Sequence, residues 1–302
     1  MSQPSPNDSD AILGGQNPQP IDAAVLGGVE GVKQQIAKEW GLSYELVDRF
    51  SFETVFVNDN AEIIDRQQKQ AFCYTVDING VPLELVCISA GSFLMGGCRQ
   101  TDYQLETQLA QPIHLVTLES FFMGKYPVTQ KQYLALMGMN PSRYQADDRH
   151  PVEEMSWRDA MEFCERLSKL TSKKFTLPSE SQWEYACRAG TDTDFCFGRQ
   201  INTKLANYDD LENDKYFRSR GRTTPVGIFS PNSWGLYDVH GNVREWCLDK
   251  YYHHGYIGAP LDGSAWSDFD TNDRSCQSYR SFRSGSWNDR REECMSYTRG
   301  LW

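Results

Sequence analysis

Hydrophobic residues first recur at helical spacing near the N-terminus. Val29, Val32 and Ile36 repeat every three or four positions, and Gly41 follows them. This spacing predicts one amphipathic helix that ends at the glycine. Residues 1–20 before it are polar and rich in Pro, Asn and Gln, which indicates a disordered or extended leader.

The pattern changes to that of strands after the helix. Residues 52–57 are rich in β-branched and aromatic side chains, as strands are. Residues 72–76 and 81–86 are also apolar and β-rich, and Asn79-Gly80 lies between them. An Asn-Gly pair between two such runs predicts a hairpin with a tight turn.

Further along, hydroxyl side chains stand three residues before an acceptor side chain, which is the spacing of a helix cap. The three pairs are Thr129 with Gln132, Ser156 with Asp159, and Ser179 with Gln182. The two Gln pairs match the capping box, whereas Asp is a weaker version of it. Short helices are therefore expected among strands and Gly/Asn/Asp-rich loops, which makes the fold class α+β with much irregular structure.

Charge and composition exclude some classes of partner. The formal net charge is -11, and a nucleic-acid partner requires a basic face, so we expect none. No apolar run approaches the roughly 20 residues that span a bilayer, so we expect no membrane segment. Residues 1–10 lack the basic and apolar parts of a signal peptide, so we expect a cytoplasmic protein.

Cysteines contribute little chemistry in this sequence. There are nine, an odd number, and none forms a C-x-x-C pair. Cys164 and Cys187 fall at apolar, helix-facing positions, where a free thiol behaves as a small hydrophobe. We expect mostly reduced, buried thiols, with Cys294 as the candidate for a reactive one.

Several motifs then occur in one order over more than half of the chain. They are GSFLMG at 91–96, FMGKYPVT at 122–129, HPV and SW within 150–157, LPSE and WEY within 177–185, GLYDVHGN and EW within 235–246, and RSGSW at 283–287. Together they resemble the formylglycine-generating enzyme family, also called the sulfatase-modifying factor family. The resemblance implies a C-type-lectin-like fold of short twisted strands, few helices, and bound calcium.

Members of that family fall into three functional classes. Some are copper-dependent oxidases that convert a cysteine of a substrate protein to formylglycine. Others are accessory domains of sulfoxide-forming iron enzymes. Many are binding modules, including the variable proteins of diversity-generating retroelements, whose ligand face lies near the C-terminal strands.

The oxidase site that the resemblance implies is incomplete in this sequence. The family holds Cu(I) with two cysteines five residues apart, and thiolates are the ligands that Cu(I) prefers. The matching positions here are Asp289 and Cys294, so one thiolate is replaced by a hard carboxylate. Ser286, which the family uses near the oxygen site, is retained, whereas Arg244 replaces an aromatic wall residue. Copper is therefore not expected, and Cys294 and Ser286 are the candidate catalytic residues only if activity survives.

Calcium is the better supported cofactor. Calcium prefers several oxygen ligands, which a short loop supplies from carboxylates and carbonyls. The family's site maps onto the Asp238 and Glu245 side chains and the Gly241 and Val243 carbonyls.

A second calcium site of the family would begin at Asn207 and the Tyr208 carbonyl. Its later ligands fall near Arg218 and Arg220, which cannot coordinate a cation, so this second site is doubtful.

The expected organisation has two parts. Residues 1–50 form the leader and the short helix, either as an adaptor or as a disordered segment. Residues 51–302 form the family-like domain. The family normally continues some 20 residues beyond the last Cys motif to a closing strand, whereas this chain stops at Trp302 and lacks that strand. We therefore expect the segment 283–302 to be packed less well than the rest, with its edge covered by the N-terminal strands or by a second chain.

The favoured hypothesis is a calcium-stabilised module that binds a protein or a small ligand through its C-terminal loops. Aromatic side chains on such loops supply contact area at a low entropic cost. The alternative is an active formylglycine-generating oxidase that acts on a cysteine of a partner protein.

Overall fold

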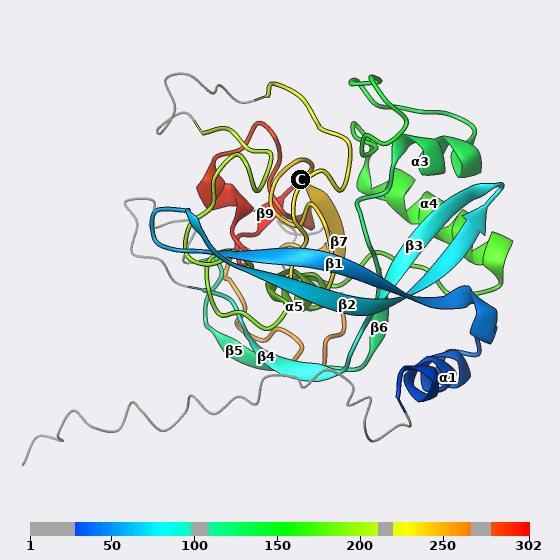
Figure 1. Cartoon of the computed structure of the whole chain (residues 1–302). Coiled ribbons are helices and arrows are strands. Elements are labelled where there is room, and N and C mark those ends of the chain that lie inside the picture. Colours follow the sequence, from blue (N-terminus) through cyan, green and yellow to red (C-terminus); the bar gives the residue numbers. More distant parts are fainter. Residues whose placement is uncertain (1–27, 98–108, 211–219, 267–278) are drawn as a thin grey trace, which may run out of the picture.

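The computed structural model describes residues 28–97, 109–210, 220–266 and 279–302. It is an α+β fold, as expected, with helices placed among three small antiparallel sheets (Figure 1). The helices are α1 (Val29–Glu39), α3 (Gln130–Met137), α4 (Trp157–Thr171) and α5 (Glu180–Arg188), with 3-10 turns η1 (Tyr44–Leu46) and η2 (Arg291–Cys294).

The largest sheet has the strand order β1-β2-β3-β6. Its strands are β1 (Val47–Val57), β2 (Ile63–Ile78), β3 (Val81–Ile88) and β6 (Phe121–Gly124). A second sheet pairs β4 (Gly91–Met95) with β5 (His114–Leu118), and a third joins β7 (Glu245–Lys250), β8 (Arg280–Arg283) and β9 (Gly300–Leu301).

The predicted hairpin is confirmed. Ile78 of β2 faces Val81 of β3 across the turn. Asn79 and Gly80 both have positive φ angles, 51° and 90°, which a two-residue hairpin turn of the I′ type requires.

The predicted N-terminal helix is confirmed as α1, which packs its buried face against the beginning of β1. Because β1 begins at Val47, the boundary expected at residue 50 falls inside this strand.

All three helix caps are also confirmed. Thr129, Ser156 and Ser179 each accept a hydrogen bond from the backbone of the third helical residue, whose side chain accepts one in return. The Asp159 version, expected to be weaker, is formed as completely as the two Gln versions. These caps fix where α3, α4 and α5 begin.

Besides the cluster that packs α1 against β1, the described residues form two larger hydrophobic cores. The larger surrounds α5, which includes the fully buried Trp183. The smaller lies between α3, α4 and the β2–β3 hairpin, and it includes Phe163 and Leu167 of α4. In Figure 1, α3 and α4 lie beside β3, whereas α5 lies beneath β1 and β2. This division into two cores leaves a space between them that is described below.

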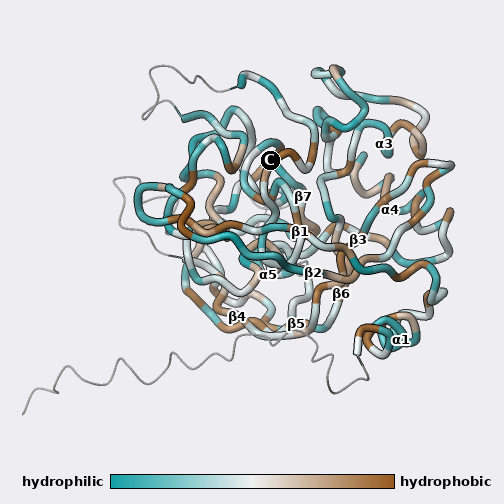
Figure 2. Tube along the Cα trace, viewed as in Figure 1, coloured by the Kyte–Doolittle hydropathy of each residue, from teal (hydrophilic) through white to brown (hydrophobic). Residues whose placement is uncertain are grey.

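Figure 2 shows hydrophobic and hydrophilic segments interspersed along the chain. Within the described residues, no helix combines the length and the apolar character that crossing a bilayer requires. The described cysteines are all free and at least partly buried, as expected.

A buried ionic network ties α5 to the C-terminal segment. Arg299 contacts Glu180 at 2.6 Å, Arg283 contacts Glu184 at 3.1 Å, and Arg188 contacts the other oxygen of Glu184 at 2.8 Å. All five side chains are almost completely buried. The expectation that the segment 283–302 is loosely packed is therefore wrong, because these ion pairs hold both of its ends against the core.

The edge expected to need a cover is formed by β9. Its two residues pair with β8, where Ser281 faces Leu301 and Phe282 faces Gly300. The N-terminal strands belong to a different sheet, so they do not cover this edge in the described chain.

Candidate functional site

The candidate site is built on two loops that cross. One loop, residues 238–242, leads into β7, and the other follows β8 at Ser284. The backbone N–H of Gly241 donates to the Ser284 carbonyl at 2.7 Å, and the Ser284 hydroxyl donates to the Gly241 carbonyl at 3.1 Å. Asp238, Asn242 and Ser284 have positive φ angles of 57°, 66° and 81°. Non-glycine residues rarely adopt positive φ angles, and the residues that do are found more often at functional sites.

Two glycines let these loops approach each other and Cys294 closely. Gly241 has φ +82°, and a Cβ there would lie 2.3 Å from the carbonyl oxygen of Asn207. Gly285 has φ +69°, and a Cβ there would lie 2.6 Å from the sulfur of Cys294. No larger residue fits at either position without moving the backbone.

Cys294 itself is enclosed at the end of η2. The residue is fully buried, and its thiol lies 3.5 Å from the Arg290 carbonyl. Burial, and then the negative charge of Asp289, raise the pKa of the Cys294 thiol well above its usual value. The protonated thiol is a poor nucleophile and a poor metal ligand.

His240 positions the backbone of Cys294. Its Nδ1 lies 2.8 Å from the Cys294 carbonyl, and its Nε2 accepts from the Cys196 N–H at 3.0 Å. Burial lowers the pKa of His240 to about 4. The imidazole is therefore neutral, with the proton on Nδ1, and has a structural role here.

Asp289 is fully engaged by its neighbours. Its two carboxylate oxygens accept from Nε and Nη2 of Arg244 at 2.7 and 2.5 Å, which is a bidentate ion pair. The Ser286 hydroxyl donates to the same carboxylate at 2.8 Å. The Arg244 guanidinium also lies 4.7 Å from the centre of the Phe282 ring.

The structure brings Ser286 and Asp289 into contact and places Cys294 near the Asp289 charge, but the sequence analysis missed that Arg244 joins this group. Arg244 and Asp289 are the two positions at which this chain departs from the oxidase pattern, and they form a salt bridge with each other. Their opposite charges were visible in the sequence and could have indicated the pairing.

A copper site does not fit this arrangement. Cu(I) prefers thiolates, but Asp289 supplies carboxylate oxygens that are already bound to Arg244 and Ser286. Cys294 is protonated and enclosed. The donor set therefore disagrees with the metal that the family uses.

Calcium fits the other charged residues of the loop better. Asp238 is buried and Glu245 is partly buried, and within the described residues no Lys, Arg or His forms a salt bridge with either. Burial raises the pKa of Asp238 to about 6. Burial, with the charge of Asp238 as a smaller cause, raises the pKa of Glu245 to about 7. The positive charge of Arg149 offsets only part of the burial effect on Asp238. Two neighbouring acids that form no salt bridge are what a bound cation would stabilise.

The hydrogen bonds of this loop leave some ligand atoms available and occupy others. Oδ2 of Asp238 accepts from the Gly227 N–H at 2.7 Å, and Oε2 of Glu245 accepts from Nε1 of Trp183 at 3.0 Å. The Gly241 carbonyl accepts from the Val243 N–H at 2.9 Å as well as from Ser284. Each carboxylate thus keeps an oxygen with weak or no hydrogen bonding in the described chain. The Gly241 carbonyl oxygen accepts both of its hydrogen bonds on one atom, whereas Oδ1 of Asp238 accepts only a long one from Nδ2 of Asn242 at 3.4 Å.

The second calcium site considered in the sequence, at Asn207, has an arginine beside it. The Arg220 guanidinium donates to the Thr203 carbonyl at 2.7 Å and to the Ala206 carbonyl at 3.4 Å. A fixed positive charge therefore lies next to Asn207, as the sequence indicated. Arg218 lies outside the described residues.

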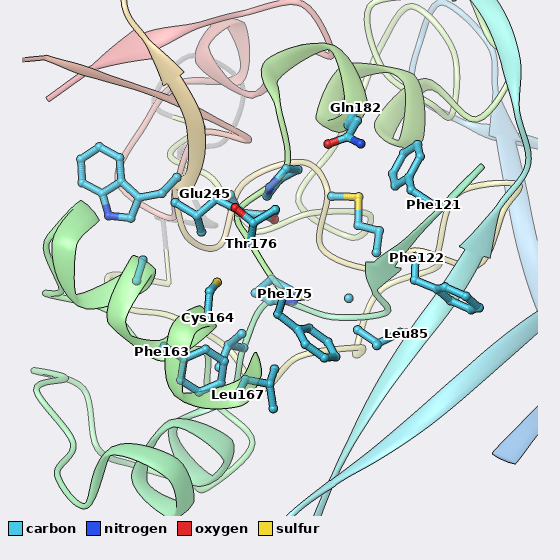
Figure 3. Close-up of a pocket in the computed structure, with 18 of the residues that line it drawn as sticks. Leu85, Phe121, Phe122, Phe163, Cys164, Leu167, Phe175, Thr176, Gln182 and Glu245 are labelled. Atoms are coloured by element: carbon cyan, nitrogen blue, oxygen red, sulfur yellow. The ribbon is translucent and has the colours of Figure 1, made fainter. Parts of the chain in front are cut away.

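A cavity of about 1660 Å³ begins at this site and extends between the two cores. Figure 3 shows Glu245 and Gln182 on one side of it, and Phe163, Leu167 and Phe175 on the opposite side. Arg244, Ser286 and Trp287 line the end near the candidate oxidase site. No sequence pattern pointed to this cavity, because its walls come from segments far apart in the chain.

The comparisons with known proteins agree with this fold. A model of the sulfatase-modifying factor enzyme 1-like domain family matches residues 78–301. The chain therefore belongs to this family, with the C-type-lectin-like fold that the motifs implied. The match begins at the end of β2, so α1, β1 and most of β2 precede it.

Individual relatives share a minority of their residues with this chain over the matched regions. Chaperone protein LppX of Paenibacillus barcinonensis is 29% identical over 231 residues, which cover 60% of this chain and 76% of LppX. The formylglycine-generating enzyme of Mus musculus is 36% identical over 112 residues, which cover 35% of this chain but only 28% of the enzyme. Variable protein 1 of Treponema denticola has a similar structure, with a TM-score of 0.62, 24% identity, and coverage of 76% of this chain and 93% of that protein.

Proposed function

We propose that this domain is a binding module of the sulfatase-modifying factor family in which the oxidase site has been replaced by a salt bridge. The observation that carries the proposal is the bidentate Arg244–Asp289 pair, which occupies the position of one copper-binding cysteine. A calcium ion held by Asp238 and Glu245 stabilises the loop beside it. The module works in the cytoplasm and takes a protein or a small molecule as its ligand, through the C-terminal loops around Ser286 and Trp287.

The names of the relatives indicate that proteins similar to this chain have more than one function. One relative is named a chaperone and another a formylglycine-generating enzyme. The likeness to the variable protein shows the fold alone at 24% identity. The choice between binding and oxidation therefore rests on this chain's own residues.

A specific observation favours the alternative, an oxidase that converts a substrate cysteine to formylglycine. Ser286 and Cys294 are both retained, and Ser286 lines the cavity end where a substrate peptide would enter. This function requires a metal ligand other than Asp289 and an exposed Cys294, and the structure provides neither in its described part.

The deciding experiment is incubation of the purified protein with Cu(I), oxygen and a Cys-x-Pro-x-Arg peptide, followed by mass spectrometry. We expect the peptide thiol to remain intact. In parallel, titration with Cu(I) or Ag(I) should show no tight one-to-one binding that Cys294→Ser removes. An aldehyde product, or a stoichiometric site lost in Cys294→Ser, would establish the oxidase instead.

A further inference from the structure

The cavity between the two cores is partly open to solvent, and it is too large to be explained as a packing defect. Its volume is about 1660 Å³, whereas native interiors contain few voids larger than a water molecule. Pockets for small molecules typically measure roughly 300–1000 Å³. A pocket of this size that is partly open to solvent can therefore admit a small molecule.

Water is a poor occupant for most of this space. The inner wall consists of aromatic and aliphatic side chains, among them Leu85, Phe122, Phe163, Leu167 and Phe175 (Figure 3). A buried water needs two to four polar partners, which such a wall does not supply.

Closure of the cavity is also opposed, because its walls belong to separate cores. Phe163 and Leu167 are held in the core formed by α3, α4 and the hairpin. Phe121 is held in the core around α5, and the capping boxes fix the first turns of both α4 and α5. Bringing the walls together would require one core to move against the other.

Charged side chains, among them Lys174 and Glu245, also line the cavity, and one neutral polar group on the wall is available to a ligand. Oε1 of Gln182 is used in the cap of α5, where it accepts from the Ser179 N–H at 3.0 Å. Nε2 of Gln182 makes no hydrogen bond within the described part of the chain, and the amide lies on the cavity wall (Figure 3). A few polar groups in an apolar pocket fix the orientation of a ligand.

From these observations we infer that the cavity binds an elongated, largely apolar small molecule that carries a hydrogen-bond acceptor for Gln182. This inference rests on the proposed role as a binding module and names the class of ligand. The lining extends from Lys173, near α1, to Ser286 and Trp302, at the C-terminal loops. An extended molecule therefore fits the cavity better than a compact one, and its far end reaches the loops proposed as the binding face.

The test uses N-phenyl-1-naphthylamine, an uncharged apolar dye whose fluorescence rises in apolar surroundings. The full chain should bind it saturably, with about one dye per chain. Cys164→Trp and Ala160→Leu add volume on the α4 wall, and each should weaken binding at least tenfold. Leu170→Trp is the matched control, because Leu170 lies on the same helix but is 45% exposed and does not line the cavity.

Folding is checked for each variant by circular dichroism and thermal unfolding, and Ala160→Leu serves if Cys164→Trp does not fold. Dye binding that is absent, non-saturable, or equally strong in the Ala160 and Leu170 variants overturns the inference. This result is independent of the copper and peptide experiment, because neither reagent enters the test. If the dye test fails and the peptide thiol stays intact, the proposed role as a binding module is retained. The apolar ligand class proposed for the cavity is then rejected.

Discussion

Two pairs of charged residues lie next to each other in the candidate site, and they differ in how their charge is balanced. Arg244 and Asp289 have opposite charges and neutralise each other through two hydrogen bonds. Asp238 and Glu245 have the same charge, and their pKa values are raised to about 6 and about 7. The first pair is complete within the chain, whereas the second needs a cation or protons from outside.

In the proposed function, this difference means that the two metal positions implied by the family resemblance have changed independently. At the proposed copper position, a guanidinium and a carboxylate form an ion pair. At the proposed calcium position, neither acid forms a salt bridge among the described residues, although the charge of Arg149 partly offsets that of Asp238. We therefore expect the first pair to be insensitive to metals and the second to be sensitive to both calcium and pH.

The largest expected effect is stabilisation by calcium. A ligand that binds only the folded state at a hundredfold excess over Kd adds about 2.7 kcal/mol to the free energy of unfolding. Thermal unfolding of metal-stripped protein should therefore shift upward on addition of calcium. Asp238→Asn should abolish the shift, whereas Asp148→Asn, at an exposed acid, should retain it. Superimposable curves in calcium and in chelator would remove calcium from the proposed function.

Loss of the Arg244–Asp289 pair should have a somewhat smaller effect. Arg244→Ala leaves Asp289 buried without its counterion, and we expect a loss of about 2 kcal/mol in the free energy of unfolding. This is below the range for fully buried pairs because the Arg244 side chain is 39% exposed. Urea unfolding measures the change.

The control for this pair is Arg166→Ala, which removes an exposed partner of Glu162 and should cost at most about 0.5 kcal/mol. The double variant Arg244→Ala/Asp289→Ala should be less destabilised than the sum of the two single variants. Strict additivity would mean that the two side chains do not interact in solution.

The smallest expected effect is a pH dependence of the calcium-free protein. The unfolded-state pKa values of Asp and Glu are about 3.9 and 4.3, below the folded values for Asp238 and Glu245. The folded chain therefore binds more protons than the unfolded chain between about pH 4 and 7, and its stability falls as the pH rises through this window.

We expect this contribution to be on the order of 1 kcal/mol. It is measured as the difference between the parent protein and Asp238→Asn/Glu245→Gln in chelator from pH 6.5 to 7.5. Calcium should remove the difference in pH dependence. A parent whose stability relative to the double variant rises with pH would contradict the raised pKa values.

Local features of the fold could be predicted from the sequence because the forces that cause them act between close neighbours. The Asn79-Gly80 turn and the Thr129, Ser156 and Ser179 caps depend on residues within four positions of one another. The ordered motifs gave the family, and with it the positions of Cys294 and Ser286.

Features that join distant segments could not be predicted in this way. Arg244 and Asp289 are 45 positions apart, and Arg299 meets Glu180 across 119 positions. The C-terminal segment was expected to be loose because the chain stops before the closing strand that the family resemblance implies. Buried ion pairs have no periodicity, so the Arg283 and Arg299 contacts that hold this segment were not visible in the pattern.

The Arg244–Asp289 pair also limits how this chain can change over generations. A path to a two-thiolate site must exchange both residues, and the first exchange leaves one charge without its partner. Because the Asp289 side chain is only 6% exposed, solvent cannot replace the lost guanidinium. An intermediate that exchanges Arg244 first is therefore less stable than either end of the path. Such an unstable intermediate hinders conversion between the two versions of this fold, even though they differ at only two of these positions.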